Sequence, residues 1–318
     1  MLRVVEPGLL STVQDGGRPG AVHLGVPVSG ACDNWSMAVA NRLLENEPGA
    51  AVLEMTLLGA TFEILASGVI AIAGADMEAV VVEDGRELSV GRSQEVEAGT
   101  SLRFAAARSG VRTYVALPGG IDVRVVLGSR ATCLSGGFGG YDGRAIAPGD
   151  VLMPVRAPAD APADRTWPSI EGDPFTDRVV QIVPLGDAPG VPRDGIAALV
   201  GQTWTVSPVG DRTGVRLDGA AIPTDASAAT LVSTGVLPGA IQLLPSGLPV
   251  VLLADAPTIG GYPVPAVVAR ADLAIVAQRQ PGDDVSFTMI SAGDARLAWA
   301  EHRRRLASAV MLLGGDSS

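Results

Sequence analysis

The 318-residue sequence predicts a mainly β protein built from two halves, with a few short helices and a C-terminal helix. Hydrophobic residues make up 47% of the chain and aromatic residues 4%, so Val, Leu, Ile and Ala must fill most of the core. The 40 glycines and 23 prolines imply many turns, and many turns imply many short strands. Apolar runs of about five residues recur between Gly, Pro or Asp, which favours a sandwich or barrel over βαβ units.

The individual elements are predicted from local patterns. Strands are expected over residues 69–73, 79–82, 113–117, 179–183 and 250–253. A helix is expected over residues 34–44, where apolar residues recur at helical spacing and Asp33 or Asn34 can cap the first turn. A short helix is expected over residues 193–200, and the C-terminal helix over residues 295–313.

A weak internal repeat relates the two halves. TVQDGGRPG at residues 12–20 resembles TVSPVGDRTG at residues 205–214, and EAGTSLRF at residues 97–104 resembles QPGDDVSF at residues 280–287. The repeat predicts two related β domains facing one another, and binding sites often form where domains meet.

Composition also suggests the domain boundaries. APADAPAD at residues 157–164 has the Pro and Ala spacing of an extended, weakly packed linker. We expect an N-terminal β domain over residues 1–160, a C-terminal β domain over residues 175–290, and a helix and tail over residues 291–318.

Charge and cysteine content exclude several classes of protein. The net charge is −11 and the arginines are scattered among acids, whereas a nucleic-acid-binding protein would show a basic face. No apolar window is long enough to span a membrane, and no signal-peptide pattern is present, so a cytoplasmic location is expected. Cys32 and Cys133 are expected to be separate thiols.

The absence of lysine is informative. All 23 basic residues are Arg, so the chain can form no Schiff base, has no Walker-type lysine and cannot carry attached biotin. Two histidines and two cysteines far apart in the sequence give too few ligands for a zinc site, and no metal is expected. The chain therefore either binds a ligand that is already activated or works beside a second polypeptide.

Two glycine-rich segments near the start hold candidate binding residues. In QDGGRPG, Gln14, Asp15 and Arg18 form either a capped turn or an anion clamp, since Arg offers a planar fork to a carboxylate. In GVPVSGACD, glycines and a proline frame Ser29 and Asp33. Asp33 can cap the following helix, and a helix N-terminus also gathers N–H groups for an anion.

Four further polar residues lie beside apolar runs. Glu54 lies inside LEMTLLG, where a carboxylate is either paired, for example with an Arg, or raised in pKa and functional. In the second half, Arg212 lies in GDRTG, Gln242 in GAIQLLPSGLP, and Asp255 at the end of an apolar strand.

A glycine turn follows Asp255. Gly260 and Gly261 would let a flat ligand approach the backbone while Tyr262 covers it; the alternative is a glycine bulge with a buried tyrosine. Together the candidates indicate a cleft that handles an acyl or carboxyl group without a metal.

Several long motifs carry a family resemblance. They include PGLLSTVQDGGRPG, GVPVSGACD, ANRLLENEPGAAVLEMTLLGA, IAGADM, GGIDVRVVLGSRAT, GGFGG, GDRTGVRLDG, GAIQLLPSGLPVVLLAD and TIGGYP. From about Val4 to Phe287 the chain resembles the biotin-dependent carboxyltransferase family, which is also called allophanate hydrolase subunit 2, KipA or the C subunit of 5-oxoprolinase.

The resemblance implies two cyclophilin-like β-barrel domains. Members act with a KipI-like B component and, in the ATP-dependent 5-oxoprolinase system, with a LamB/YcsF-like A component. The resemblance implies that this chain is the C component of such a bacterial enzyme, which converts 5-oxo-L-proline to L-glutamate, with ATP used by the assembled complex. The alternatives are a urea or amide carboxyltransferase that uses biotin on a separate carrier, and a non-catalytic KipA-type antagonist of a KipI-like protein.

The candidates match signature positions of that family. The resemblance implies that Asp33, Glu54 or Asp255 positions water or a proton. It implies that the substrate, a small amide or lactam, is bound by Gln14, Asp15, Arg18, Ser29, Arg212, Gln242, Gly260, Gly261 and Tyr262, with Arg18 and Arg212 on its carboxylate or a phosphoryl group. Three departures from the family pattern stand at Cys32, at Thr213 and at residues 256–259, and the last removes polar groups beside the expected cleft.

Overall fold

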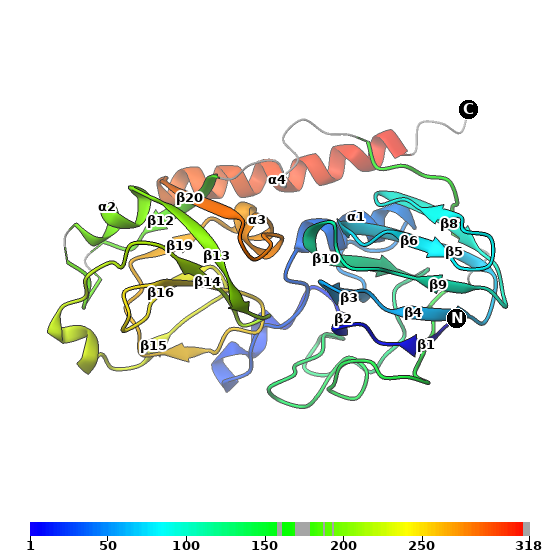
Figure 1. Cartoon of the computed structure of the whole chain (residues 1–318), viewed down its shortest axis with the longest axis horizontal. Helices are drawn as coiled ribbons and strands as arrows, with labels where there is room; N and C mark the ends of the chain where they lie inside the picture. The colour runs from blue at the N-terminus through cyan, green and yellow to red at the C-terminus, as the bar shows by residue number, and fades with distance from the viewer. Residues whose placement is uncertain (158–160, 169–178, 187, 193, 314–318) are drawn as a thin grey trace. The chain divides into compact units, whose positions relative to one another are not determined.

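The computed structural model describes residues 1–157, 161–168, 179–186, 188–192 and 194–313, and over them the chain is mainly β, as predicted. It divides into two compact units, each with its own sheets (Figure 1). Unit 1 comprises Met1–Arg18, Ser29–Ile170 and Arg305–Ser318, and unit 2 comprises Pro19–Val28 and Glu171–Arg304. The boundaries predicted at residues 160 and 175 stay a prediction.

Unit 1 contains two antiparallel sheets. The six-stranded sheet has the order β11 (Val151–Leu152), β1 (Leu2–Glu6), β4 (Thr61–Ile64), β9 (Ser101–Arg103), β6 (Ala79–Val81), β7 (Glu87–Leu88). The five-stranded sheet has the order β2 (Leu10–Gln14), β3 (Val52–Thr56), β10 (Ser109–Ala116), β5 (Gly68–Asp76), β8 (Arg92–Val96). Residues from both sheets contribute to one buried hydrophobic cluster, so the sheets pack face to face.

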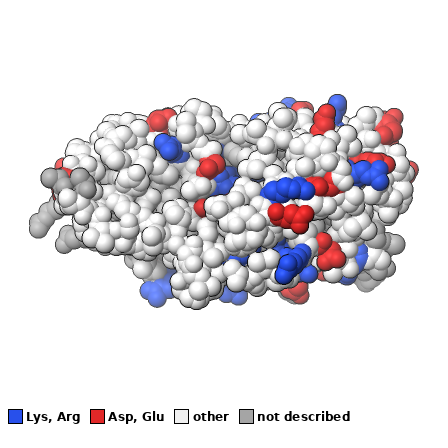
Figure 2. All heavy atoms as spheres, turned by 90° about the horizontal axis from the view of Figure 1, so that it is seen from below, with Lys and Arg blue, Asp and Glu red and all other residues white. Residues whose placement is uncertain are grey.

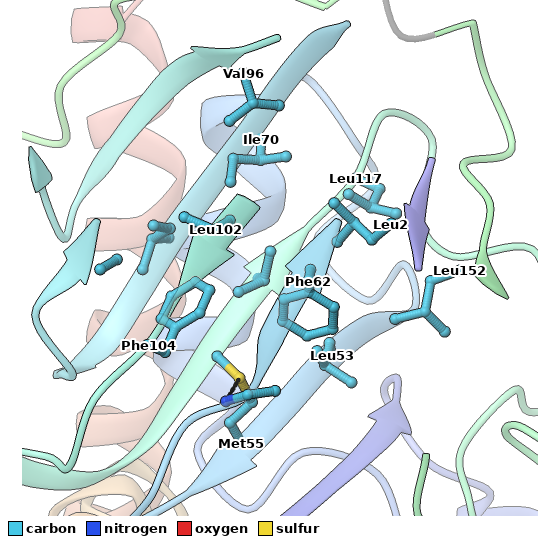
Figure 3. Packing of buried hydrophobic residues seen from close by; sticks show 14 of the residues in the cluster. Leu2, Leu53, Met55, Phe62, Ile70, Val96, Leu102, Phe104, Leu117 and Leu152 are labelled. Atoms are coloured by element: carbon cyan, nitrogen blue, oxygen red, sulfur yellow. Dashed lines mark hydrogen bonds between the residues drawn. The ribbon is translucent and has the colours of Figure 1, made fainter. Parts of the chain in front are cut away.

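Figure 3 shows this core from close by. Leu53 and Met55 project into it from β3, because alternate residues of a strand point to the same face. Phe62 and Phe104 meet edge to face with their ring centroids 6.3 Å apart. The same alternation sends Glu54 to the opposite face of the five-stranded sheet, away from the core, and this second face holds the candidate site.

Helix α1 (Asn34–Leu43) contacts β5, β8 and β10 of the five-stranded sheet. Its N-cap is Asp33, as predicted: the residue has extended backbone and its carboxylate accepts a hydrogen bond from the Ser36 N–H at 2.9 Å. The helix is buried along nearly its whole length. The cap therefore fixes where the chain turns from the glycine-rich segment into a buried helix.

Unit 2 is a closed barrel. Its seven strands have the order β12 (Val179–Pro184), β19 (Ala266–Val268), β16 (Ala240–Leu243), β17 (Pro249–Leu252), β14 (Gly214–Asp218), β13 (Thr203–Gly210), β20 (Asp284–Met289). The parallel pairing of β12 with β20 and the antiparallel pairing of β13 with β20 complete the closure. Two further strands, β15 (Thr234–Gly235) and β18 (Ile259–Gly260), form a separate pair.

The remaining helices are α2 (Gly195–Val200), α3 (Leu273–Ala277) and α4 (Ala292–Leu313), with 3₁₀ turns η1 (Pro19–Leu24), η3 (Ala226–Thr230) and η4 (Arg270–Asp272). All five predicted strands are present, as β5, β6, β10, β12 and β17. Helix α4 begins three residues earlier than predicted, because Ser291 Oγ accepts from the Asp294 N–H at 3.1 Å and the Asp294 carboxylate accepts from the Ser291 N–H at 3.4 Å.

Two predictions fall partly outside the described residues. The predicted short helix starts at residue 193, which lies outside the described residues. Residues 158–160 of the predicted linker also lie outside them. The end of that linker is tied down, since the Asp164 N–H donates to the Ser93 carbonyl at 3.0 Å, and Thr166 bridges to Arg92 on β8.

One face of the molecule is sparsely charged (Figure 2). Figure 2 shows positive and negative side chains interspersed on one face, most of which is uncharged. Within the described residues, no helix is long and apolar enough to cross a membrane.

Candidate functional site

Gln14 and residues 29–33, the end of the glycine-rich segment GVPVSGACD, form the first part of a polar cluster in unit 1. Gln14 ends β2 and is fully buried. Its Nε2 donates to Thr12 Oγ1 at 2.9 Å and to the Thr132 carbonyl at 3.4 Å, and its Oε1 accepts from the Gly30 N–H at 3.1 Å. The predicted binding residue Gln14 thus links β2 to two loops that are remote in sequence.

Asp15 holds the same two loops together. Its carboxylate accepts from Ser129 Oγ at 2.6 Å, the Arg130 N–H at 2.5 Å and the Gly17 N–H at 2.8 Å. Its carbonyl accepts from the Ala31 N–H at 3.0 Å. The bond from the Gly17 N–H is the backbone cap that the turn interpretation assigns to Asp15, while the anion clamp stays a prediction.

Arg18 is 2% exposed, which is rare for a guanidinium. Its Nη2 donates to the Ala131 carbonyl, and its Cζ lies 5.2 Å from the centre of the Phe138 ring, within cation–π range. A Cβ on Gly139 would come within 2.2 Å of the Ala131 carbonyl oxygen that accepts from Arg18, so this close packing needs a glycine. Arg18 is therefore packed against Phe138 and Gly139 of the GGFGG motif.

Ser29 combines strain with an unused hydroxyl. Its φ is +52°, a left-handed conformation that is uncommon for residues other than glycine. It is 3% exposed, and its Oγ has no hydrogen-bond partner among the described residues. The following Gly30 has φ +84°, and a Cβ there would come within 2.8 Å of the Asp15 carbonyl oxygen.

Glu54 lies at the centre of the cluster. On neighbouring strands Glu54 pairs directly with Tyr114, whose hydroxyl donates to Glu54 Oε2 at 2.8 Å. The same oxygen accepts from the Cys32 N–H at 2.9 Å, and the Asp33 N–H donates to the Tyr114 hydroxyl oxygen at 2.8 Å. The Arg112 guanidinium lies 3.9 Å from the other carboxylate oxygen, and both side chains are almost fully buried.

Tyr114 is held in its neutral form. Burial, followed by the negative charges of Glu54 and Asp33, raises the pKa of its phenol well above the usual 10. It therefore remains a hydrogen-bond donor to Glu54 throughout the physiological pH range. The sequence prediction missed Tyr114 and Arg112: it treated residues 113–117 only as a strand, and nothing local indicates that this strand pairs with the one holding Glu54.

In unit 2, the predicted residues Arg212 and Asp255 form a buried ion pair. Arg212 Nε donates to Asp255 Oδ2 at 2.8 Å, and Nη2 donates to Oδ1 at 3.3 Å, a bidentate arrangement. The two side chains are 3% and 10% exposed. Backbone bonds reinforce the contact, since the Asp255 N–H donates to the Arg212 carbonyl at 3.0 Å. The guanidinium is thus already engaged by a carboxylate of its own unit.

Gln242 and Gly260 are close neighbours in unit 2. Gln242 is buried on β16, and its Nε2 has no hydrogen-bond partner within the described part of the chain. A Cβ on Gly260 would come within 2.4 Å of that nitrogen, so the amide would have to shift to admit a side chain at residue 260.

An apolar cavity of about 420 Å³ adjoins this pair. Gly260 and Tyr262 line it together with residues such as Leu231, Val236 and Leu237. Tyr262, which lines the cavity, is itself 45% exposed. Gly261 is not among the lining residues; it faces Ser233 and Leu231 instead.

The predicted residues thus fall into two groups. Unit 1 brings together Gln14, Asp15, Arg18, Ser29, Asp33 and Glu54, and adds Tyr114 and Arg112. Unit 2 brings together Arg212 with Asp255, and Gln242 with the cavity beside Gly260 and Tyr262. One pocket shared by both groups stays a prediction, as do the substrate-binding and proton-transfer roles.

Chemically, the buried polar groups of unit 1 include the Ser29 hydroxyl, the Gln14 amide and the Arg18 guanidinium, and Arg112 lies beside the Glu54 carboxylate. Within the described residues no three His, Cys, Asp or Glu side chains are grouped so that they could hold a metal ion, and both cysteines are buried thiols.

Comparison with known proteins gives concordant matches. A family model for the carboxyltransferase domain, subdomain A and B, matches residues 24–289. The chain is 33% identical to the C subunit of 5-oxoprolinase from Escherichia coli over 306 residues, which cover 96% of each protein. It is 33% identical to urea amidolyase of Lachancea kluyveri over 92% of this chain and 17% of that protein. The crystal structure of Kluyveromyces lactis urea carboxylase matches 97% of this chain and 29% of that one, with a TM-score of 0.85 and 29% identity.

Proposed function

Because the chain belongs to the family of the carboxyltransferase domain, subdomain A and B, we propose that it is the C subunit of an ATP-dependent 5-oxoprolinase. In this role it helps convert 5-oxo-L-proline to L-glutamate together with the A and B components. The observation that carries the proposal is the end-to-end match with a protein of that name, 96% of each chain. The urea amidolyase match covers 17% of a much longer protein, which makes a carboxyltransferase for urea the second candidate.

The reaction opens a lactam by addition of water, and ATP hydrolysis drives it. We place ATP with the assembled complex, since this chain has no lysine for a Walker-type phosphate site. We propose a KipI-like protein as the B component, a LamB/YcsF-like protein as the A component, and a location in the bacterial cytoplasm. Biotin is not attached to this chain in either candidate function.

The polar cluster of unit 1 supports a role in holding the substrate. A buried hydroxyl without a partner, a buried amide and a buried guanidinium are the groups that orient a small polar ligand. Donors fixed before the reaction stabilise a developing oxyanion without reorganising. Arg212 is engaged by Asp255 in unit 2, and we propose that Arg18 meets the substrate carboxylate, because its buried guanidinium belongs to the same unit as the Ser29 hydroxyl and the Gln14 amide.

The test is reconstitution. The chain is purified alone, with the KipI-like protein, and with both partners, and ATP-dependent glutamate release from 5-oxo-L-proline is followed. We expect turnover in the complete mixture and none from the single chain. In the complete mixture Arg18→Gln should raise KM for 5-oxo-L-proline at least about tenfold, because a charge-assisted contact is removed.

Arg103→Gln is the matched control, since Arg103 is an exposed residue of β9. Full turnover by the single chain would show that it needs no partners and would overturn its place in a complex. Carboxylation of urea by a mixture with a biotin-bearing carrier would favour the second candidate. Tight binding to the KipI-like protein without activity in any mixture would favour a non-catalytic antagonist.

A further inference from the structure

Glu54 and Tyr114 hold two consecutive backbone N–H groups. Glu54 Oε2 accepts from the Cys32 N–H and the Tyr114 hydroxyl oxygen accepts from the Asp33 N–H, while Tyr114 itself donates to Glu54. The four groups form one connected set of three hydrogen bonds of 2.8 to 2.9 Å, all buried. In a buried network each bond strengthens its neighbours, so the backbone at residues 32 and 33 is firmly held.

These hydrogen bonds hold residues 32 and 33, the C-terminal end of the glycine-rich segment GVPVSGACD. Gln14 and Asp15 hold residues 30 and 31 of the same segment. Gln14 Oε1 accepts from the Gly30 N–H, and the Asp15 carbonyl accepts from the Ala31 N–H. Every backbone N–H from residue 30 to residue 33 therefore donates to a group on β2, β3 or β10 or to the residue that follows β2. The segment is preorganised by the five-stranded sheet.

Ser29 is the residue that this arrangement leaves unexplained. Its left-handed backbone is strained, and its buried hydroxyl is without a partner in the described structure. A glycine would remove the strain, and an alanine would remove the unsatisfied group. Strain and an unused polar group at one buried position are typical of a functional contact.

We propose that Glu54 and Tyr114 are positioning residues, and that the group they position for the ligand is the Ser29 hydroxyl. The ligand atom it meets is an oxygen of a small amide or carboxylate, which accepts a hydrogen bond from the hydroxyl. This inference rests on the proposed function for the identity of the substrate. It assigns Glu54 a role different from the proton transfer that the sequence suggested, because the Tyr114 hydroxyl and the Cys32 N–H already bond to one of its oxygens.

The first test compares Glu54→Gln, Glu54→Ala and Tyr114→Phe in the reconstituted complex. Glutamine keeps an oxygen that accepts both hydrogen bonds, so we expect kcat/KM within about tenfold of the unmodified chain. Alanine and phenylalanine remove an acceptor, so amide hydrogen exchange at residues 32 and 33 should accelerate about tenfold or more, with a matching rise in KM. A loss of kcat of about a hundredfold or more in Glu54→Gln, with unchanged exchange at residues 32 and 33, would overturn the proposal, since that is the behaviour of a proton-transfer group.

The second test compares Ser29→Gly and Ser29→Ala. We expect the thermal unfolding temperature of the glycine variant to equal or exceed that of the unmodified chain, because glycine adopts positive φ without strain. Both variants should raise KM for 5-oxo-L-proline about tenfold while leaving exchange at residues 32 and 33 unchanged. Unchanged KM and kcat in both would refute the Ser29 contact.

Failure of the proposed function gives a different result. If the unmodified complex does not act on 5-oxo-L-proline, that function is wrong and the substrate assigned to Ser29 is wrong with it. Hydrogen exchange on Tyr114→Phe and Glu54→Ala is measured without substrate, so it still decides whether the two residues position the segment.

Discussion

Removing the Asp255 carboxylate should sharply destabilise unit 2. Asp255→Ala leaves the Arg212 guanidinium, whose side chain is 3% exposed, without its bidentate partner. The loss of one member of a buried ion pair costs about 3–5 kcal/mol. The middle of that range is close to a thousandfold change in the folding equilibrium constant.

Urea unfolding followed by tryptophan fluorescence measures the effect, because Trp204 is fully buried in the same barrel. With a slope of about 2 kcal/mol per M, the midpoint should fall by about 2 M. The matched control is Glu63→Ala, which removes the exposed ion pair between Arg3 and Glu63 and should cost less than about 1 kcal/mol. A double variant, Arg212→Met with Asp255→Leu, should recover most of the loss, since apolar residues of similar volume often replace a buried pair without cost.

The reasoning fails if Asp255→Ala moves the midpoint no more than Glu63→Ala does. The Arg212 guanidinium would then not depend on Asp255, and it would again be a candidate for holding the substrate carboxylate.

Further predictions concern other contacts. Gly260→Ala should lower stability by less than the about 1–3 kcal/mol typical of overpacking, because the atom 2.4 Å from the added Cβ is Gln242 Nε2, the end of a flexible side chain that can shift; thermal unfolding measures the change, and a larger loss would contradict this reasoning. The hydrogen bonds from Arg144 lower the pKa of Asp150 below its ordinary 3.8, so this pair stabilises the folded state above that pH. The stabilisation by the Arg144–Asp150 pair is lost as the pH falls through the lowered pKa of Asp150. Arg144→Gln should therefore make the free energy of unfolding depend less on pH in that acidic range. Tyr114 makes stability depend on pH at the alkaline end. Its phenol ionises near pH 10 in the unfolded chain but stays neutral in the folded chain, so stability falls as the pH rises above about 10. Tyr114→Phe should remove that part of the alkaline dependence in urea titrations, and an unchanged dependence would contradict the assignment.

Local patterns were sufficient to predict most elements. The five strands are recognisable in the sequence because each is an apolar run bounded by turn residues. The Asp33 cap is recognisable because apolar residues recur at helical spacing directly after it. The helix α4 start was misplaced because Ser291 and Asp294 cap it three residues upstream of the apolar pattern. Each of these features depends on neighbours within a few positions.

The site depends on pairing between distant segments. Glu54 was expected to be paired or functional, and the structure gives it Arg112 at 3.9 Å and Tyr114 at 2.8 Å. Tyr114 is 60 positions away, and it meets Glu54 because β3 pairs with β10, a crossover that no local pattern specifies. Asp15 similarly meets Ser129 across 114 positions. Sequence reasoning identified the polar residues but not their partners.

The assignment of Pro19–Val28 to unit 2, while the chain on both sides of it lies in unit 1, limits how this protein can be dissected. A single break near residue 170 gives two fragments, and the second of them lacks a peptide that its own fold includes. When the two fragments are co-expressed, the first fragment carries the Pro19–Val28 peptide and would have to supply it to the second. A second fragment with the Pro19–Val28 peptide grafted back would supply unit 2 in full for measurements on it alone.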